Sequence, residues 1–201
     1  LGPAMTREQA MAAIDTGIEL VKTCKDEGYN ILATGEMGIG NTTTSSAVSA
    51  VLLRKSASEM TGVGAGLEEA GLRRKVAAVE TAIAVNQPDP ADALDVLAKR
   101  GGFDIAGMVG LYLGGALYRV PIVVDGFISA TAALVASRIW PEARKSMLFS
   151  HVSAEPASRA VLAALDAKPL IQADMRLGEG TGAVALLPLL DLTLALYYDL
   201  I

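Results

Sequence analysis

Apolar residues recur at helical spacing along most of the chain, and glycine-rich segments and short continuous apolar runs separate these stretches. The spacing predicts helices over 6–26, 41–55, 68–85, 89–101, 104–118, 130–138, 155–165 and 183–200. The first helix opens on a capping box, Thr6-Arg7-Glu8-Gln9. Asp89 and Asp104 are the expected N-caps of the fourth and fifth helices. Apolar runs bounded by turn-forming residues predict strands at 30–34, 120–124 and 146–150.

Strands and helices alternate along the chain, which is the order of an α/β protein. We therefore predict a three-layer, doubly wound, Rossmann-like parallel sheet with helices on both faces. Residues 1–201 then form one α/β domain that ends in the helix over about 183–200. Ligands bind at the carboxyl ends of strands in such a sheet, so we expect the segments 35–41, 125–129 and 150–155 to converge on one crevice.

Composition and charge narrow the class of protein. Hydrophobic residues make up 52% of the chain but aromatic residues only 4%, and there are 20 glycines, a balance that favours close-packed helices on a sheet. The formal net charge is −5 and no basic run extends beyond Arg73-Arg74-Lys75, which argues against a nucleic-acid partner. No charge-free run, 105–118 included, reaches the ~18 residues of a membrane span, so we expect no membrane partner.

The cysteine and histidine counts restrict the chemistry further. One cysteine, Cys24, and one histidine, His151, exclude a disulfide within the chain and a Cys/His zinc cage. Cysteine usage of this kind is typical of a reducing, cytoplasmic compartment. Residue 1 is a leucine and a helix begins almost at once, so we expect a further N-terminal segment in the natural protein.

The segment 35–42, GEMGIGNT, nearly matches the phosphate-loop pattern G-x-x-x-x-G-K-[ST] and falls between a predicted strand and a predicted helix. Asn41 replaces the lysine, however, and Glu36 would repel a polyphosphate. Backbone amides at the helix N-terminus can still hold one phosphate, so Gly38, Gly40, Asn41 and Thr42 are candidate contacts of a monophosphate. As a dinucleotide fingerprint G-x-G-x-x-G the segment fails at Thr43, which disfavours a nicotinamide-dependent dehydrogenase.

Two glutamates, Glu36 and Glu179, are flanked by glycines in predicted loops. Glycine lets a ligand approach the backbone and leaves the carboxylate partly desolvated, which raises its pKa toward that of a useful base. A helix-capping or solvent-facing glutamate is the alternative. From spacing alone, Lys75 is one of a basic trio on a solvated helix face. Asp125 is either a ligand contact or a turn-former, and His151 is interpreted as structural because no nucleophile elbow G-x-S-x-G occurs.

Five segments together resemble one family, the nicotinate-nucleotide:dimethylbenzimidazole phosphoribosyltransferases. They are GEMGIGNTTT at 35–44, GGFDIAG at 101–107, VDGFIS at 124–129, SHVSAE at 150–155 and RLGEGTG at 176–182. The resemblance implies a homodimer that moves the phosphoribosyl group of nicotinate mononucleotide onto a benzimidazole nitrogen, in cobalamin lower-ligand synthesis, without a cofactor or a metal. It also implies that family members extend further at the N-terminus. By the same resemblance, residues 1–201 are one nucleotide-binding and catalytic α/β domain, and the terminal helix over about 183–200 is a candidate part of a small helical domain.

The resemblance also assigns residues. Glu179 matches the base that takes the benzimidazole proton, and Glu36 and Lys75 match the other charged residues of the active site. The expected substrate contacts are Gly38, Gly40, Asn41, Thr42, Gly64, Asp125, Gly126, Ser153 and Leu177. A truncated, non-catalytic nucleotide- or base-binding module is the alternative function.

Overall fold

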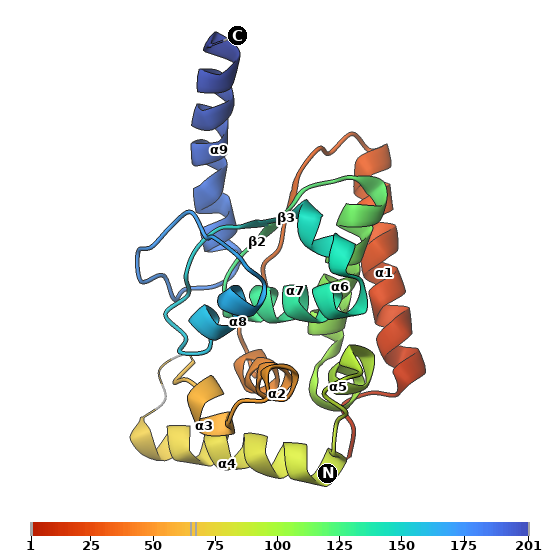
Figure 1. The fold of residues 1–201 in the computed structure, drawn as a ribbon, viewed down its shortest axis with the longest axis vertical. Coiled ribbons are helices and arrows are strands. Elements are labelled where there is room, and N and C mark those ends of the chain that lie inside the picture. The colour runs from red at the N-terminus through yellow and green to blue at the C-terminus, as the bar shows by residue number, and fades with distance from the viewer. Residues whose placement is uncertain (1, 65, 67, 201) are drawn as a thin grey trace.

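The computed structural model describes residues 2–64, 66 and 68–200. Its strands are β1 (Leu32–Ala33), β2 (Ile122–Val124) and β3 (Met147–Phe149) (Figure 1). The helices before β2 are α1 (Arg7–Asp26), α2 (Asn41–Leu53), α3 (Ala57–Met60), α4 (Glu69–Asn86), α5 (Ala93–Arg100) and α6 (Phe103–Tyr118). Those after it are α7 (Phe127–Ile139), the 3-10 helix η1 (Pro141–Ser146), α8 (Ser158–Ala164) and α9 (Thr181–Asp199).

The sheet is parallel, with the strand order β1-β2-β3. Ile122 and Val124 point into the main core with α6 and α7, whereas Val123 points to the opposite face, where Leu186 of α9 covers it. Helices therefore lie on both faces, and the prediction of an α/β protein with a parallel sheet is confirmed. The order is consecutive, so the reversal of a doubly wound sheet does not occur among the described strands.

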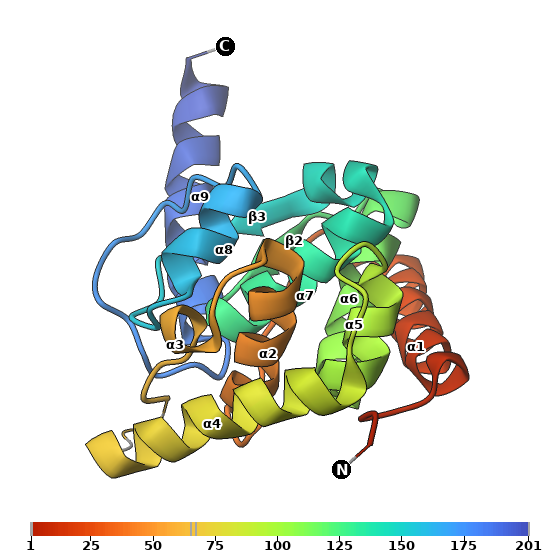
Figure 2. The same cartoon turned by 60° about the horizontal axis from the view of Figure 1, so that its bottom comes forward.

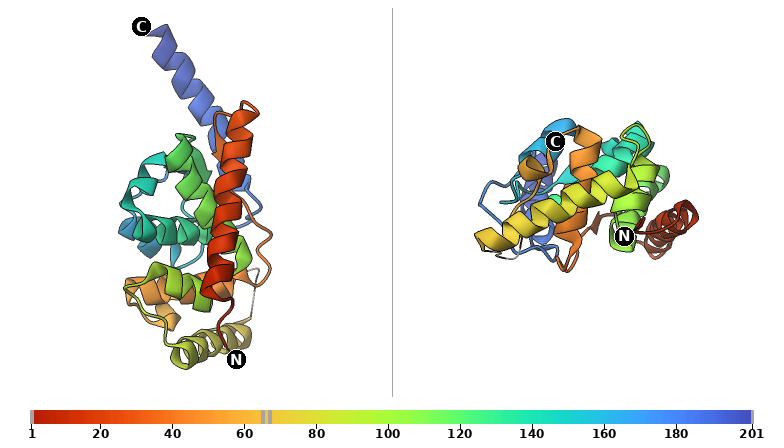
Figure 3. Two further views of the ribbon diagram at one scale, coloured as in Figure 1. Left: turned by 90° about the vertical axis from the view of Figure 1, so that its right-hand side faces the viewer. Right: turned by 90° about the horizontal axis from the view of Figure 1, so that it is seen from below.

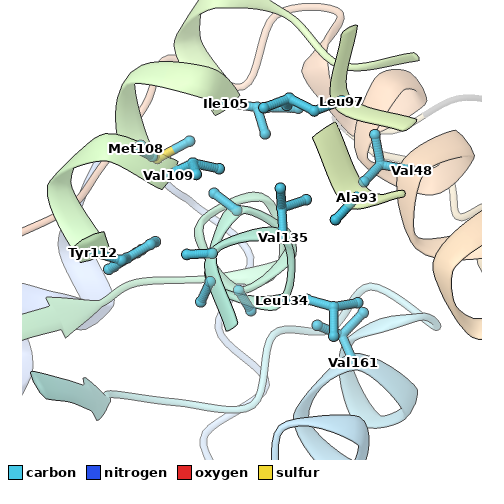
Figure 4. Close-up of a cluster of buried hydrophobic side chains, with 14 of the residues drawn as sticks. Val48, Ala93, Leu97, Ile105, Met108, Val109, Tyr112, Leu134, Val135 and Val161 are labelled. Atoms are coloured by element: carbon cyan, nitrogen blue, oxygen red, sulfur yellow. The ribbon is translucent and has the colours of Figure 1, made fainter. Parts of the chain in front are cut away.

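The main core is built from aliphatic side chains, as the low aromatic content predicts. Figure 4 shows α7, through Leu134 and Val135, surrounded by side chains of α2, α5, α6 and α8. Tyr112 is a fully buried aromatic exception, and its hydroxyl pairs with Thr34 Oγ1 at 3.0 Å and donates to Ser129 O at 3.2 Å. The carboxyl end of β1 is thereby tied to α6 and α7.

Helices α1 and α6 lie side by side with their backbones in close contact (Figure 3). A Cβ added at Gly17 would lie 2.1 Å from Gly107 O, and one added at Gly110 would lie 2.0 Å from Ile14 O. Small residues at these two positions are therefore required by the approach of the helices.

Several predicted helix starts are wrong. Helix α5 begins at Ala93, because Asp92 and not Asp89 accepts from the amides of Leu94 and Asp95, at 3.0 and 3.1 Å. Asp89 instead closes a turn by accepting from Ala91 N. Asp104 is not a cap either: Gly102 is the N-cap of α6. Helix α7 begins at Phe127, earlier than predicted, and α3 and η1 were not predicted.

Helix α9 leaves the body of the molecule and ends in a projecting C-terminal half (Figures 1 and 2). Its first turns bury Gly182, Ala183 and Leu186, whereas residues 191–200 are all exposed. The helix has the length and apolar composition of a membrane span, with a mean hydropathy of 1.5, a test that core helices of globular proteins also pass.

Candidate active site

The first glycine loop connects β1 to α2, as predicted. Gly38 and Gly40 both have a φ of 79°, a conformation that favours glycine, and Gly40 is the N-cap of α2. No side chain caps the start of α2, so no capping residue accepts hydrogen bonds from the backbone amides of its first turn. These amides face the glycine loop. The positive end of the helix dipole is therefore available to an anion.

Glu36 turns its carboxylate back into this loop. Its Oε2 accepts from Gly38 N at 2.6 Å and from Asn41 Nδ2 at 2.7 Å. Burial raises the pKa of the Glu36 carboxyl above its ordinary value, while the two hydrogen bonds act against this. Asn41 Nδ2 also donates to Asp104 Oδ2 at 3.0 Å, which links the loop to α6. The Gly38 amide thus serves Glu36, and anion binding is left to the amides that start α2.

The loop that carries Glu179 lies directly against the Glu36 loop. Glu179 N donates to Glu36 O at 3.2 Å, and a Cβ at Gly35 would lie 2.7 Å from Gly180 N. Glu179 has a φ of 56°, in the left-handed region. The expectation that its carboxylate is partly desolvated is not met, because the residue is exposed. The two glutamates nevertheless belong to one edge of the molecule, held together through their backbones.

Asp125 holds the Glu179 loop in place through hydrogen bonds. Its buried carboxylate accepts from Gly180 N at 3.2 Å and from Ala183 N at 3.0 Å, and so caps the start of α9. The sequence left a ligand contact and a turn-former as alternatives for Asp125. The structure adds a third role, since both carboxylate oxygens bond to the segment that follows Glu179.

Lys75 is buried, with a side chain that reaches from α4 to the loops. Its Nζ donates to Thr42 Oγ1 at 3.0 Å and to Gly62 O at 2.9 Å, and a Cβ at Gly64 would lie 3.3 Å from Nζ. The interpretation of Lys75 as a residue of a solvated face is therefore wrong. Burial lowers the pKa of the Lys75 ammonium, and the charge of Glu155 acts in the opposite direction.

His151 is buried next to Asp125, in the space that Gly182 leaves. A Cβ at Gly182 would lie 2.0 Å from its Nδ1. Nδ1 pairs with Ser150 Oγ at 2.9 Å, and that hydroxyl also lies within hydrogen-bonding distance of Val124 O and Asp125 O. Burial lowers the pKa of the His151 imidazole, and Asp125 opposes this. The ring is held by packing and by Ser150, and it also lines the cleft at the ends of the strands, so the interpretation of a structural histidine stays a prediction.

The three strand-ending segments line one cleft of about 170 Å³, as expected. A second cavity of about 460 Å³ adjoins it through Glu36, Met37 and Ile39, and is otherwise lined by Gly35, Asn41 and residues of α1 and α6. Within the part of the chain that the structure describes, no group of three or more His, Cys, Asp and Glu side chains is arranged to hold a metal ion.

A family model described as phosphoribosyltransferase matches residues 1–200. The chain belongs to this phosphoribosyltransferase family. The nicotinate-nucleotide–dimethylbenzimidazole phosphoribosyltransferases of Ruminiclostridium cellulolyticum and Clostridium acetobutylicum are 53% and 50% identical to it over 199 residues. A crystal structure of CobT from Thermus thermophilus superposes with a TM-score of 0.89 at 43% identity, covering 94% of this chain and 56% of that one. The two curated matches take in 99% of this chain but only 56% of each relative, so the chain spans about half their length.

The residues that the phosphoribosyltransferase resemblance assigns divide into those that line the 170 Å³ cleft and those that lie next to it. Those that line the 170 Å³ cleft are Glu36, Gly38, Thr42, Gly64, Asp125, Gly126, Ser153 and Leu177. Lys75 lies behind Thr42 and Gly64, Asn41 lies in the adjoining cavity, and Gly40 and Glu179 lie at the ends of their loops. Glu155 also lines the cleft and was not singled out from the sequence, although it closes the segment 150–155.

Proposed function

We propose that this chain carries the nucleotide-binding and catalytic part of a nicotinate-nucleotide:dimethylbenzimidazole phosphoribosyltransferase. The reaction transfers the 5-phosphoribosyl group of nicotinate mononucleotide to 5,6-dimethylbenzimidazole. It yields α-ribazole 5′-phosphate and nicotinate, with inversion at the anomeric carbon, in cobalamin lower-ligand synthesis. Two kinds of observation support this: the names of the relatives, and the contact between the Glu36 and Glu179 loops beside one cleft.

The 5′-phosphate of the donor fits the uncapped start of α2. A single phosphate needs the helix amides and one nearby cation, and does not need the lysine of a phosphate loop. Lys75 is that cation, held against Thr42 and the loop of Gly64. Gly126, Ser153 and Leu177 line the other sides of the cleft, where the nicotinate and ribose portions are expected to bind.

The departure of the leaving group, nicotinate, needs little assistance from the protein. An acceptor nitrogen of benzimidazole forms a bond to C1′, and the bond from C1′ to the pyridinium nitrogen breaks. The bonding pair returns to the ring, so nicotinate leaves without a proton. The proton lost by the benzimidazole goes to Glu179 in this proposal, a step for which general-base assistance is typically worth roughly 10²- to 10⁴-fold in rate. Glu36, fixed by Gly38 and Asn41, is placed to stabilise positive charge near C1′.

Other parts of the proposal follow the family resemblance. The protein is expected to act as a cytoplasmic homodimer on small-molecule substrates, without a cofactor, a metal, a nucleic-acid partner or a membrane. The terminal helix, over about 183–200, is expected to contribute to a small helical domain. The exposed second half of α9 supports this expectation, because its apolar residues are not covered by the rest of the described chain.

The test is to incubate the purified protein with nicotinate mononucleotide and dimethylbenzimidazole and to measure nicotinate and α-ribazole 5′-phosphate by chromatography. Equimolar formation of both products is expected. Omission of the benzimidazole is the control, since hydrolysis alone would release nicotinate without ribazole phosphate. Binding of the nucleotide without product would instead favour the non-catalytic module, and the names of the relatives favour the enzyme.

A further inference from the structure

Glu155 is a carboxylate of the cleft that has no part in the function proposed above. It lies between β3 and α8, is half-buried, and lines the cleft with Thr42, Gly64 and Ser153. Its Oε2 is buried and has no hydrogen-bond partner. A buried acceptor without a donor costs free energy, so this oxygen is unusual unless a bound molecule supplies a donor.

The position of Glu155 depends on a glycine of the second glycine loop. A Cβ at Gly62 would lie 2.2 Å from Oε2 and 2.5 Å from Cδ of Pro156. The carbonyl of the same glycine accepts from Lys75 Nζ at 2.9 Å. The carboxylate and the ammonium therefore approach Gly62 from different sides, close to the proposed phosphate site.

The charge of Lys75 determines which ligand suits Glu155. The charge of Glu155 raises the pKa of Lys75, against the effect of burial. A metal ion beside this ammonium is disfavoured by repulsion. An ionised carboxylate only accepts hydrogen bonds, and its two oxygens match two neighbouring hydroxyl donors. Oε2 faces Gly62 in the structure, so the whole side chain must change rotamer for both oxygens to reach a ligand in the cleft.

We propose that Glu155 binds the vicinal 2′- and 3′-hydroxyls of the ribose of the phosphoribosyl donor. The inference rests on the proposed function, because it needs a ribose phosphate in this cleft. Ribose hydroxyls bind carboxylates in the same manner in dinucleotide-binding folds. Lys75 and the start of α2 would then hold the phosphate while Glu155 fixes the sugar, so that C1′ lies toward the two glutamate loops.

The experiment compares nicotinate mononucleotide with its 2′-deoxy and 3′-deoxy analogues, on the wild-type protein and on Glu155→Ala and Glu155→Gln. Dissociation constants are measured by calorimetry and kcat/KM by nicotinate release. Removal of one hydroxyl is expected to weaken wild-type binding by about 10- to 100-fold, as for a hydrogen bond to a charged group. Glu155→Ala should bind the natural donor about as weakly, and at least one analogue should then cause little further loss.

Two outcomes overturn the inference. If both analogues weaken binding to Glu155→Ala as much as to the wild type, the residue does not contact the diol, although the proposed function stands. If the wild type binds no nicotinate mononucleotide, both proposals fail together. Glu155→Gln keeps the size and one acceptor oxygen, so an intermediate loss is expected from it even where the alanine variant folds poorly. Glu142→Ala, an exposed glutamate paired with Lys145, is the matched control.

Discussion

Glu36 and Glu179 have the same sequence context and different surroundings. Each is flanked by glycine, but Glu36 is half-buried and accepts two hydrogen bonds, whereas Glu179 is exposed on a left-handed backbone. Environments of such different kinds can separate the tasks of two carboxylates. The assignment of the base to Glu179 stays a prediction, because the residue lacks the desolvation that the sequence led us to expect.

Replacement of Glu179 by glutamine tests that assignment. Glutamine keeps the shape but cannot accept the proton, so kcat is expected to fall by roughly 10²- to 10⁴-fold. The dissociation constant for nicotinate mononucleotide should be nearly unchanged, because the residue lies outside the nucleotide cleft. Steady-state kinetics and calorimetry measure the two quantities, with the exposed Glu80→Gln as control. A variant with wild-type turnover would show that another group is the base.

His151 allows a pH measurement free of overlap, because it is the one histidine of the sequence. Burial lowers the pKa of its imidazole below the ordinary 6.5, and Asp125 acts in the opposite direction. We expect the ring resonances to titrate below pH 6.5 by NMR, and at still lower pH in Asp125→Asn. As the pH drops, the imidazole of the unfolded chain is protonated at a higher pH than that of the folded chain. The free energy of unfolding should therefore fall as the pH drops from about 6.5 to the pKa of the folded state. A pKa above 6.5 would contradict the argument from burial.

At the scale of elements, the contact of α1 with α6 requires glycine at positions 17 and 110, where the side chain is a single hydrogen atom. Gly110→Ala would put a methyl group 2.0 Å from Ile14 O, which forces the backbones apart. We expect a loss of about 1–3 kcal/mol in unfolding free energy, the usual range for overpacking. Gly107→Ala is the matched control on the same helix, since its Cβ meets nothing within 4 Å. It should gain up to about 1 kcal/mol in helix propensity. Urea denaturation of both variants decides, and equal stabilities would refute the close approach.

The junction between the Glu179 loop and α9 depends on Asp125. In Asp125→Asn one of the two acceptor oxygens becomes an amide donor that faces a backbone donor, Gly180 N or Ala183 N. We expect kcat to fall about 10-fold or more, because the loop with Glu179 is no longer fixed, and cleavage at Arg176 by trypsin to become faster. Unchanged proteolysis and turnover would mean that the two bonds are dispensable.

Local sequence patterns predicted the helices, strands and loops more reliably than they predicted the long-range contacts. The capping box at Thr6 and the glycines at 38 and 40 depend on neighbouring residues, and both predictions agree with the structure. Lys75 was misread because its burial results from α4 crossing α2, which no spacing within α4 encodes. The prediction of Asp89 as a cap was wrong because Asp92 has the same capping chemistry, and only the folded turn distinguishes the two.

At the scale of the whole molecule, α9 divides into an inner part, which covers one face of the sheet, and an outer part, which is exposed. Leu186 packs with Val123 on the face of the sheet opposite the main core, whereas residues 191–200 are exposed and the helix contains Pro188. This division accounts for the exposed apolar side chains at the C-terminal end of the helix, which lie beyond the sheet.

Two changes in the same helix should therefore have very different effects on the free energy of unfolding. Leu186→Ala removes a fully buried side chain and is expected to cost about 2–5 kcal/mol of unfolding free energy. Deletion of residues 191–200 removes exposed side chains only, and should change it by less than about 0.5 kcal/mol. Urea denaturation followed by circular dichroism measures both. If the deletion destabilises the domain as much as Leu186→Ala does, the outer half of α9 is part of the same cooperative unit, because only interactions that break on unfolding contribute to that free energy.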